Sequence, residues 1–313
     1  MDFKKLNNLG GLVALIISLV SYLLTLEPTV SLWDCGEFIA ASNLLMVVHP
    51  PGAPLFLMLG RFFSLFAGGD LSQVASMVNS LSALASALTV MFTFWIITYY
   101  AKRIIVKNNK ENEPDTIQKF LIIIAGLVGS LALTYTDTFW FSAVEAEVYA
   151  LSSFFTAITF WAILKWERVA DEPGAHRWIV LIGYLIGLAV GVHLLNLLVI
   201  PAILYVYFFK KFNYSLANLI KATVLGFIIL GFIQVGVIPG LPALAASLDR
   251  LFVNSFGLGF GSGVIFLAAI VIAGLIYGLY YSHKKVKPLL NTILLAFTFL
   301  LVGYVTYRLV IIR

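Results

Sequence analysis

The sequence predicts an all-α fold, a polytopic membrane helix bundle with about nine transmembrane spans. Of the 313 residues, 61% are hydrophobic and only 11% are charged. A soluble domain is about 45–50% apolar and about 25% charged. The mean hydropathy of +0.99 agrees, and most of the apolar residues fall in long runs. We therefore expect residues 1–313 to form a single transmembrane domain.

The first span is predicted at residues 9–26, "LGGLVALIISLVSYLLTL", which is close to the about 20 residues that a membrane helix needs. Lys4 and Lys5 precede it, as basic residues precede the core of a signal peptide. The apolar run is longer than that core, and no small-residue cleavage site follows it. We expect this span to be retained.

Further apolar runs predict the other spans, at residues 72–100, 118–135, 143–164, 178–193, 195–209, 216–238, 263–281 and 288–307. The longest segment outside the membrane is the first outer loop, at about 27–71. Within it, residues 34–47 contain neither Gly nor Pro after Gly36 and predict a short interfacial helix. Residues 54–67 are apolar, short and interrupted by Arg61, which suits a helix that lies in the interface or re-enters the membrane better than a full span.

The Lys and Arg residues predict the orientation of these spans, because cytoplasmic loops carry an excess of both. With the N-terminus inside, all of the 20 basic residues fall on the inner side except Arg61, Arg250, Arg308 and Arg313. The loop at 102–117 is then cytoplasmic. The outer face is acidic and holds Glu27, Asp34, Glu37, Asp70, Asp137, Glu145, Glu147 and Asp249.

Two features of the composition exclude other classes of protein. Cys35 is the one cysteine in the chain, so no internal disulfide framework can form. The net charge of +5 reflects the basic inner loops, and we expect no nucleic-acid partner.

The stretch "WDCGEF", residues 33–38, places Asp34 and Glu37 three residues apart and so on one face of a helix. Both lie near the start of that helix, where the helix dipole favours carboxylates. The simpler interpretation is therefore N-terminal capping. Capping does not explain why the following turn, "HPPGAP", carries His49. That turn cannot be helical, because Pro lacks a backbone donor and Gly allows unusual dihedral angles.

Other polar residues are predicted on the same outer surface. Glu145 and Glu147 are two residues apart, so on a helix only one of them can face a shared site. His193 and Asn196 share one face of an outer helix end, where His193 can also be a packing residue. Arg61 lies in an apolar stretch, where a charge requires a partner or an anionic ligand.

The position of the ionisable residues favours one class of membrane protein over another. An ion-coupled transporter places such groups near the bilayer midplane. Here the central parts of the long spans lack Asp, Glu, Lys and Arg, and the acids gather at one face. This pattern favours a reaction at the interface, between a lipid-linked donor and an acceptor from the outer side.

Four motifs in order resemble a known family. They are "DCGEF" in the first outer loop, "HPPGAPLF" after it, "EAEVYAL" at the start of a later span and "HLLNL" beyond that span. Together they resemble large uncharacterised bacterial membrane proteins and the animal endoplasmic-reticulum O-mannosyltransferase that acts on plexin-type receptors. These proteins belong to the GT-C superfamily of glycosyltransferases. The motifs cover residues 30–200, and their combined order is more specific than any one of them.

The resemblance implies a membrane glycosyltransferase that moves a sugar from a polyprenyl-phosphate donor to a protein hydroxyl. Mannose is the sugar that we expect. GT-C enzymes carry a catalytic acid in the first outer loop, which implies that Asp34 is the general base, with Glu37 supporting it. His49 and Arg61 would bind the lipid phosphate. The substrate-binding set that we expect is His49, Arg61, Glu145, Glu147, His193 and Asn196.

The resemblance also implies partners and a location. We expect membrane lipids, the lipid-linked donor and a protein acceptor as partners, in the bacterial inner membrane with the site facing the periplasm. No cofactor is expected, although clustered acids offer the oxygen ligands that a divalent cation takes. We expect Asp34, Glu37, His49, Glu147 and His193 to surround one outward-facing cavity, with Arg61 at its lipid-side edge.

This chain differs from the family pattern in two places. Family members continue into a long C-terminal soluble region, whereas this sequence stops at "RLVIIR". Three interpretations are open: a naturally short member of the family, a fragment of a longer protein, or one subunit of a complex. Cys35 stands where the family has Ser, and its small thiol should be tolerated. The alternative function is a non-catalytic transporter or scaffold subunit for envelope assembly.

Overall fold

The computed structural model describes residues 2–106 and 113–306, and these residues form an all-helical fold. Eight of their helices are long and apolar enough to cross a membrane, which confirms the predicted polytopic bundle. Lys107, Lys110, Arg308 and Arg313, on which the orientation partly depends, lie outside the described residues, as does the last residue of the span predicted at 288–307.

The candidate spans correspond closely to the predicted ones. They are α1 (Phe3–Leu24), η2 and α4 (Leu71–Gln73 and Val74–Ile105), α5 (Thr116–Thr134), α7 (Val148–Val169), η3 and α9 (Leu194–Leu198 and Val199–Lys211), α10, η4 and α11 (Leu216–Gly231, Phe232–Gly240 and Leu241–Phe256), α12 (Ser262–Lys284) and α13 (Pro288–Thr306). The run at 178–193 forms α8 (His176–Val190), whose 15 residues are fewer than the about 20 that a membrane helix needs.

The chain divides into two compact units. The first contains the chain up to Leu164 together with Leu188–Asn196, and the second contains Lys165–Gly187 and Leu197–Val305. All of the residues that the sequence singles out as candidate site residues fall in the first unit.

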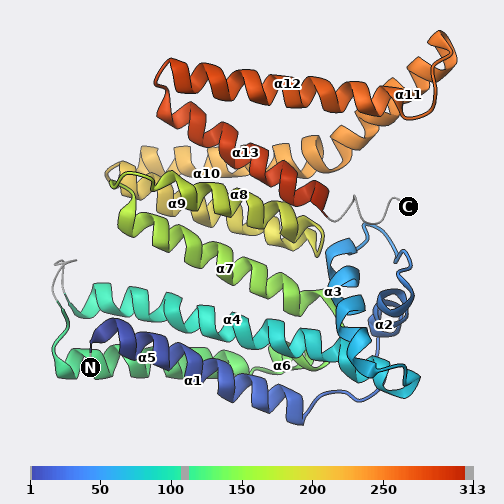
Figure 1. Ribbon diagram of the computed structural model, residues 1–313. Coiled ribbons are helices and arrows are strands. Elements are labelled where there is room, and N and C mark those ends of the chain that lie inside the picture. The colour runs from blue at the N-terminus through green and yellow to red at the C-terminus, as the bar shows by residue number, and fades with distance from the viewer. Residues whose placement is uncertain (1, 107–112, 307–313) are drawn as a thin grey trace. The chain divides into compact units, whose positions relative to one another are not determined.

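In the first unit, α1, α4 and α5 pack side by side (Figure 1). Phe94 of α4 is fully buried and packs in a core with Ala14. The helices approach closely because α5 has Gly126 at the contact, where an added Cβ would lie 2.6 Å from the side chain of Thr98. Small residues at such contacts let membrane helices pack by direct van der Waals contact.

The two helices predicted in the first outer loop are confirmed. They are α2 (Cys35–Leu44) and α3 (Pro54–Ser64), and the one-turn helix η1 (Leu65–Ala67) continues α3. Gly60 of α3 lies against Ser42 of α2, and an added Cβ would overlap the Ser42 hydroxyl. Both helices contact α4, so the loop folds back onto the bundle.

The "HPPGAP" segment forms the non-helical corner that its Pro and Gly residues predict. The N–H of Gly52 donates to the carbonyl of His49 at 2.9 Å, and Gly52 has a φ of 79°, a conformation that Gly adopts without strain. Pro54 then begins α3, and the N–H of Leu55 donates to the carbonyl of Gly191 at 2.8 Å. This bond connects the first loop to the segment that follows α8.

The Glu145–Glu147 segment differs from its prediction. The short helix α6 (Asp137–Val144) ends just before it, and α7 begins just after it. Both carboxylates therefore lie in a three-residue connection rather than on opposite faces of one helix. The N–H of Glu27 donates to the carbonyl of Val144 at 3.1 Å, so this connection lies beside the start of the first outer loop.

The second unit contains a helix longer than the predicted span at 216–238, because α10, η4 and α11 run on without a break to Phe256. The segment η4 is a π-helix and contains Pro239, which lacks the N–H that an α-helix would use. The hydroxyl of Tyr304 donates to the carbonyl of Ile238 at 3.0 Å. A wider helical turn thus accommodates Pro239 just beyond the end of the predicted span.

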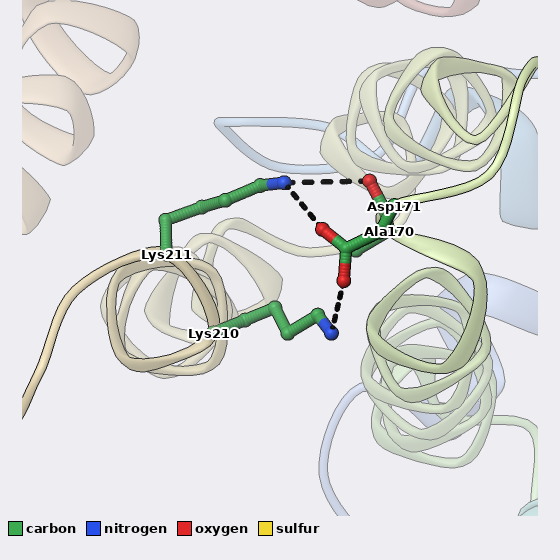
Figure 2. Close-up of polar contacts among 4 residues, drawn as sticks. All are labelled: Ala170, Asp171, Lys210 and Lys211. Carbon is green, nitrogen blue, oxygen red and sulfur yellow. Dashed lines mark hydrogen bonds and ion pairs between the residues drawn. The ribbon is translucent and has the colours of Figure 1, made fainter.

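A group of charged residues on the predicted inner side joins two elements of the second unit (Figure 2). Asp171 follows α7 and accepts from Lys210 Nζ at 2.7 Å and from Lys211 Nζ at 3.1 Å. Lys211 also donates to the carbonyl of Ala170 at 3.4 Å. The two ammonium groups, Lys210 first, lower the pKa of Asp171. The Asp171 side chain is exposed, so these ion pairs fix geometry more than they add stability.

The orientation can be tested with Val47 and Glu113, which lie in the predicted outer and inner loops and are exposed. In a Cys35→Ser background, we expect a membrane-impermeant maleimide to label Val47→Cys in intact cells. Glu113→Cys should react only after permeabilisation. Labelling of Glu113→Cys from outside would contradict the predicted orientation.

Candidate functional site

Asp34 stands at the point where the first outer loop enters α2. The preceding residue, Trp33, is 87% exposed and has a φ of 62°, which is rare for a bulky residue and marks a sharp turn. Asp34 occupies the N-cap position of α2, but its side chain makes no capping hydrogen bond. The capping interpretation is therefore wrong for Asp34. Its exposed carboxylate is left available for another role.

Glu37 holds His49 through two contacts. Its Oε1 accepts from the backbone N–H of His49 at 2.8 Å, and its Oε2 lies 2.7 Å from His49 Nδ1. The other ring nitrogen, Nε2, faces Asp34 Oδ2 at 3.9 Å. The hydrogen bond to His49 lowers the pKa of Glu37, and the same contact raises the pKa of His49. The start of α2 and the "HPPGAP" corner thus form one ionisable cluster.

Glu147 is a buried carboxyl group beside this cluster. Its side chain is 5% exposed, and burial is the largest cause that raises its pKa to about 7. The negative charges of Glu145 and Asp34 raise it further, whereas backbone amides of Val148 and Asp34 lower it. A carboxyl group with this pKa exists in both protonation states near neutral pH.

Glu145 is buried as well, but it points to a different partner. Its Oε2 accepts a hydrogen bond from the hydroxyl of Ser31. Burial raises its pKa, and the bond from Ser31 lowers it. The contact ties the α6–α7 connection to the first outer loop just before Asp34.

Asn79 is a residue at this site that sequence reasoning missed. It is fully buried on α4, and its Nδ2 donates to the carbonyls of Glu27 at 2.7 Å and Thr29 at 3.1 Å. Its Oδ1 lies 3.9 Å from the thiol of Cys35, within the range of a hydrogen bond to sulfur. One side chain therefore anchors both ends of the segment that leads to Asp34. The sequence does contain a signal that could have identified Asn79, because a polar residue within an apolar span usually has a specific partner.

We expect Asn79→Leu to lower the thermal unfolding midpoint, because the partly buried carbonyls of Glu27 and Thr29 lose their donor. Leaving a buried polar group unsatisfied costs about 1–3 kcal/mol. The measurement is thermal unfolding in detergent. Ser80→Ala is the matched control, because Ser80 bonds only within its own helix, to the carbonyl of Met77. Equal midpoints in the two variants would show that Asn79 does not anchor the loop.

Arg61 lies on α3 and binds uncharged oxygen atoms. Its Nη1 donates to the carbonyl of Asn43 at 2.8 Å, to Asn43 Oδ1 at 3.0 Å and to Ser64 Oγ at 3.3 Å. Within residues 2–106 and 113–306, no carboxylate forms an ion pair with it. Its positive charge is partly buried and stays available to an anion.

His193 and Asn196 lie in the segment between α8 and α9. His193 Nδ1 accepts from the N–H of Leu195 at 3.2 Å, and its ring lies 5.4 Å from that of Tyr149. Burial lowers its pKa. Asn196 is 2% exposed and forms hydrogen bonds with Ser152 and Thr156, both on α7. Asn196 therefore attaches the segment between α8 and α9 to α7.

The structure brings some of the predicted site residues together and separates others. Asp34, Glu37 and His49 form one cluster, and Glu147 faces it from the α6–α7 connection. His193 reaches that connection through the ring of Tyr149, and Asn196 donates to the His193 carbonyl at 3.0 Å. Arg61 has other partners. The ligand atoms of Asp34, Glu37 and His49 lie within 4.8 Å of one another, close enough to hold a metal ion. No other group of three His, Cys, Asp or Glu side chains in the described part of the chain is as close. The Glu37–His49 hydrogen bonds account for this cluster, and we assign no metal to it.

Comparisons with known proteins place this region in a family. Residues 34–218 match the family described as "Protein O-mannosyl-transferase TMEM260 N-terminal domain". A Dictyostelium discoideum protein, "Protein O-mannosyl-transferase tmem260", is 26% identical over 166 residues, which are 53% of this chain and 18% of that protein. The Mus musculus "Protein O-mannosyl-transferase TMEM260" is 26% identical over 162 residues, 51% of this chain and 20% of that protein.

No solved structure matches the chain significantly. The match spans about a fifth of the length of the two curated relatives. The family match begins at Asp34 and covers more than half of the chain, including the cluster around His49 and the His193 segment. The chain therefore belongs to the family of the TMEM260 protein O-mannosyl-transferase N-terminal domain.

Proposed function

We propose that this chain transfers a sugar from a polyprenyl-phosphate donor to a hydroxyl group of a protein, and that this sugar is mannose. The observation that carries the proposal is the exposed carboxylate of Asp34, which is positioned by α2, free of any capping role and flanked by ionisable groups. Family membership supports the reaction class.

Asp34 is the general base of this proposal. A carboxylate only accepts hydrogen bonds, so it can receive the proton of a Ser or Thr hydroxyl as that oxygen attacks the sugar C1. The bond between C1 and the phosphate oxygen breaks, and the phosphate leaves with its negative charge. The exposure of Asp34 suits an acceptor that arrives from the aqueous side.

Arg61 is the proposed contact for the lipid phosphate. Its Nη1 is used by Asn43 and Ser64, which fixes the plane of the guanidinium group. The remaining donors can bind phosphate in the two-bond geometry that Arg favours. The neighbouring side chains Phe62 and Phe66 are more than half exposed and offer an apolar surface for the lipid.

Glu147 and His193 are the proposed sugar-side residues. A buried Glu147 that carries a proton part of the time can donate a hydrogen bond to a sugar hydroxyl and accept one from it. His193 faces the Tyr149 ring near the same connection. Glu145 and Asn196 would support these groups, through Ser31 and through α7 respectively.

The predicted orientation puts this site on the outer face of the membrane, which would be the periplasmic side of a bacterial inner membrane. The lipid-linked donor then approaches through the bilayer and the protein acceptor from water. Exposed apolar residues beside the cluster support an interfacial position. Leu44, Leu45, Met46 and Val47 are each more than half exposed.

The test uses the 313-residue chain in proteoliposomes. Polyprenyl-phosphate mannose, polyprenyl-phosphate glucose and nucleotide-linked mannose are each incubated with a mixture of Ser- and Thr-containing peptides. We expect one hexose to be added from polyprenyl-phosphate mannose and none from the nucleotide sugar. Absence of transfer from every lipid-linked donor would reject the proposal and favour a non-catalytic transporter or scaffold subunit.

A further inference from the structure

Glu37 contacts both the backbone and the ring of His49, whereas one of these contacts would be enough to hold the loop. One carboxylate holds both the backbone N–H and the ring Nδ1 of the same histidine, at 2.8 and 2.7 Å. These two contacts fix the position of the backbone and the rotation of the ring together. The centroid of the Phe38 ring lies 6.0 Å from that of the imidazole, and the two ring planes are inclined at 64°.

This contact determines which ring nitrogen carries the proton. The hydrogen bond from His49 lowers the pKa of Glu37, so Glu37 is a carboxylate and can only accept. Nδ1 must therefore carry a hydrogen in both charge states of the imidazole. In the neutral ring, Nε2 is left with a lone pair.

Nε2 is directed toward Asp34. The distance from Nε2 to Asp34 Oδ2 is 3.9 Å, which a small movement or one bridging water can span. The titratable groups that face His49 are Glu37 and Asp34 at the start of α2 and Glu147 from the α6–α7 connection. All three are acids, so the surroundings of the ring stabilise an imidazolium.

We propose that Glu37 and His49 are a positioning pair that returns Asp34 to its carboxylate form after each transfer. This inference rests on the proposed function. The proton leaves the acceptor hydroxyl for Asp34 as the bond from oxygen to the sugar C1 forms. It then passes from Asp34 to Nε2 of His49, and the imidazolium, held by Glu37, releases it to water. His49 thus acts at Asp34, whereas the family resemblance implies a contact with the lipid phosphate.

The proposal makes the reaction depend on pH in a defined direction. His49 can take a proton only when it is neutral, so the rate should fall as pH falls through the pKa of His49. Glu37 raises that pKa above its ordinary value, followed by the charges of Asp34 and Glu147. Removing the charge of Glu37 should therefore move the acidic limb of the pH–rate profile to lower pH.

The first experiment is the pH–rate profile of Glu37→Gln, with Glu27→Gln as the matched control. Glu27 lies in the same loop and its carboxylate accepts from the N–H and hydroxyl of Thr29, so the control removes a similar charge away from His49. We expect the acidic limb to move to lower pH in Glu37→Gln and to stay in place in the control. An unmoved limb in Glu37→Gln would overturn the proposal.

His49→Gln separates this role from a structural one. We expect the acidic limb to disappear and kcat to fall at least about tenfold, since proton transfer by a positioned group is worth about 10²–10⁴-fold. The KM for the donor should stay within about twofold, because His49 does not bind the phosphate. A raised donor KM with an unmoved acidic limb would assign His49 to the phosphate instead.

The second experiment does not depend on activity. Nitrogen-15 NMR of histidine-labelled protein distinguishes the two imidazole tautomers, and the chain has only 4 histidines. We expect the Nδ1–H tautomer for His49. His193 is the internal reference with the opposite tautomer, because its Nδ1 accepts from the N–H of Leu195. Each signal is assigned from its loss in His49→Gln or His193→Gln.

The outcomes separate this inference from the function on which it rests. An Nε2–H tautomer at His49 in a protein that transfers sugar would overturn the positioning pair alone. A wild-type protein that transfers no sugar would overturn both proposals, even with the Nδ1–H tautomer present. Transfer together with the Nδ1–H tautomer and a shifted limb in Glu37→Gln would support both.

Discussion

The Asp34→Asn variant should lose nearly all sugar transfer while it folds normally. The substitution keeps the size of the side chain and removes its ability to accept a proton. General-base assistance is worth about 10²–10⁴-fold in rate. Folding should be unaffected, because the Asp34 side chain is exposed and makes no capping hydrogen bond. The measurement is the initial rate of transfer to a peptide at saturating donor.

Asp137→Asn is the matched control for this experiment. Asp137 is an exposed carboxylate in the first turn of α6, on the predicted outer side, and the proposed reaction does not use it. Equal thermal midpoints in both variants would exclude a folding defect as the cause. If Asp34→Asn keeps more than about a tenth of the wild-type rate, Asp34 is not the general base.

Arg61 should determine how tightly the donor binds. Hydrogen bonds to charged groups contribute about 1.5–3 kcal/mol each, so we expect Arg61→Met to raise the donor KM by about 10- to 150-fold. Arg61→Lys keeps the charge but not the two-bond geometry, and its donor KM should fall between those of the wild type and Arg61→Met. The KM is measured for polyprenyl-phosphate mannose at saturating peptide.

The control for this second prediction is Arg250→Met, on α11 of the other unit. Arg250 is exposed and makes one hydrogen bond of 3.4 Å, to Ser247, so its loss should leave the donor KM unchanged. Arg61→Met also removes the contacts to Asn43, and its thermal midpoint must therefore be compared with that of Arg61→Lys. A donor KM that is unchanged in Arg61→Met would remove Arg61 from the phosphate site.

The local elements of the first outer loop could be predicted from sequence because local chemistry determines them. The absence of Gly and Pro after Gly36 predicted α2, and the "HPPGAP" turn predicted the corner before α3. Apolar run length predicted most of the spans. It failed at Pro239, where a π-helical turn lets the helix continue to Phe256.

The contacts that build the site could not be predicted from local patterns. The bonds from Asn79 to the carbonyls of Glu27 and Thr29 join residues about 50 positions apart in the chain. The bond from Ser31 to Glu145 spans an even longer stretch. Sequence spacing identified Asp34 and Glu37 as neighbours, but only the folded corner shows that Glu37 binds His49.

Tertiary contacts also changed the interpretation of individual residues. The helix dipole favours a carboxylate at the start of α2, yet the Asp34 side chain does not cap that helix. Asn196, predicted beside His193 on one helix face, donates to the His193 carbonyl at 3.0 Å and also forms hydrogen bonds with α7. The direction of the Asn196 side chain therefore depends on Ser152 and Thr156, which lie about 40 positions away in the sequence.

The role of Asp34 in sugar transfer can be read from the mass of an acceptor peptide after incubation with proteoliposomes and polyprenyl-phosphate mannose. Wild-type protein, Asp34→Asn and Asp137→Asn are compared at equal protein concentration. We expect the peptide to gain the mass of one hexose with the wild type and Asp137→Asn, and to gain none with Asp34→Asn. Equal gains with all three proteins, or no gain with any of them, would contradict this expectation.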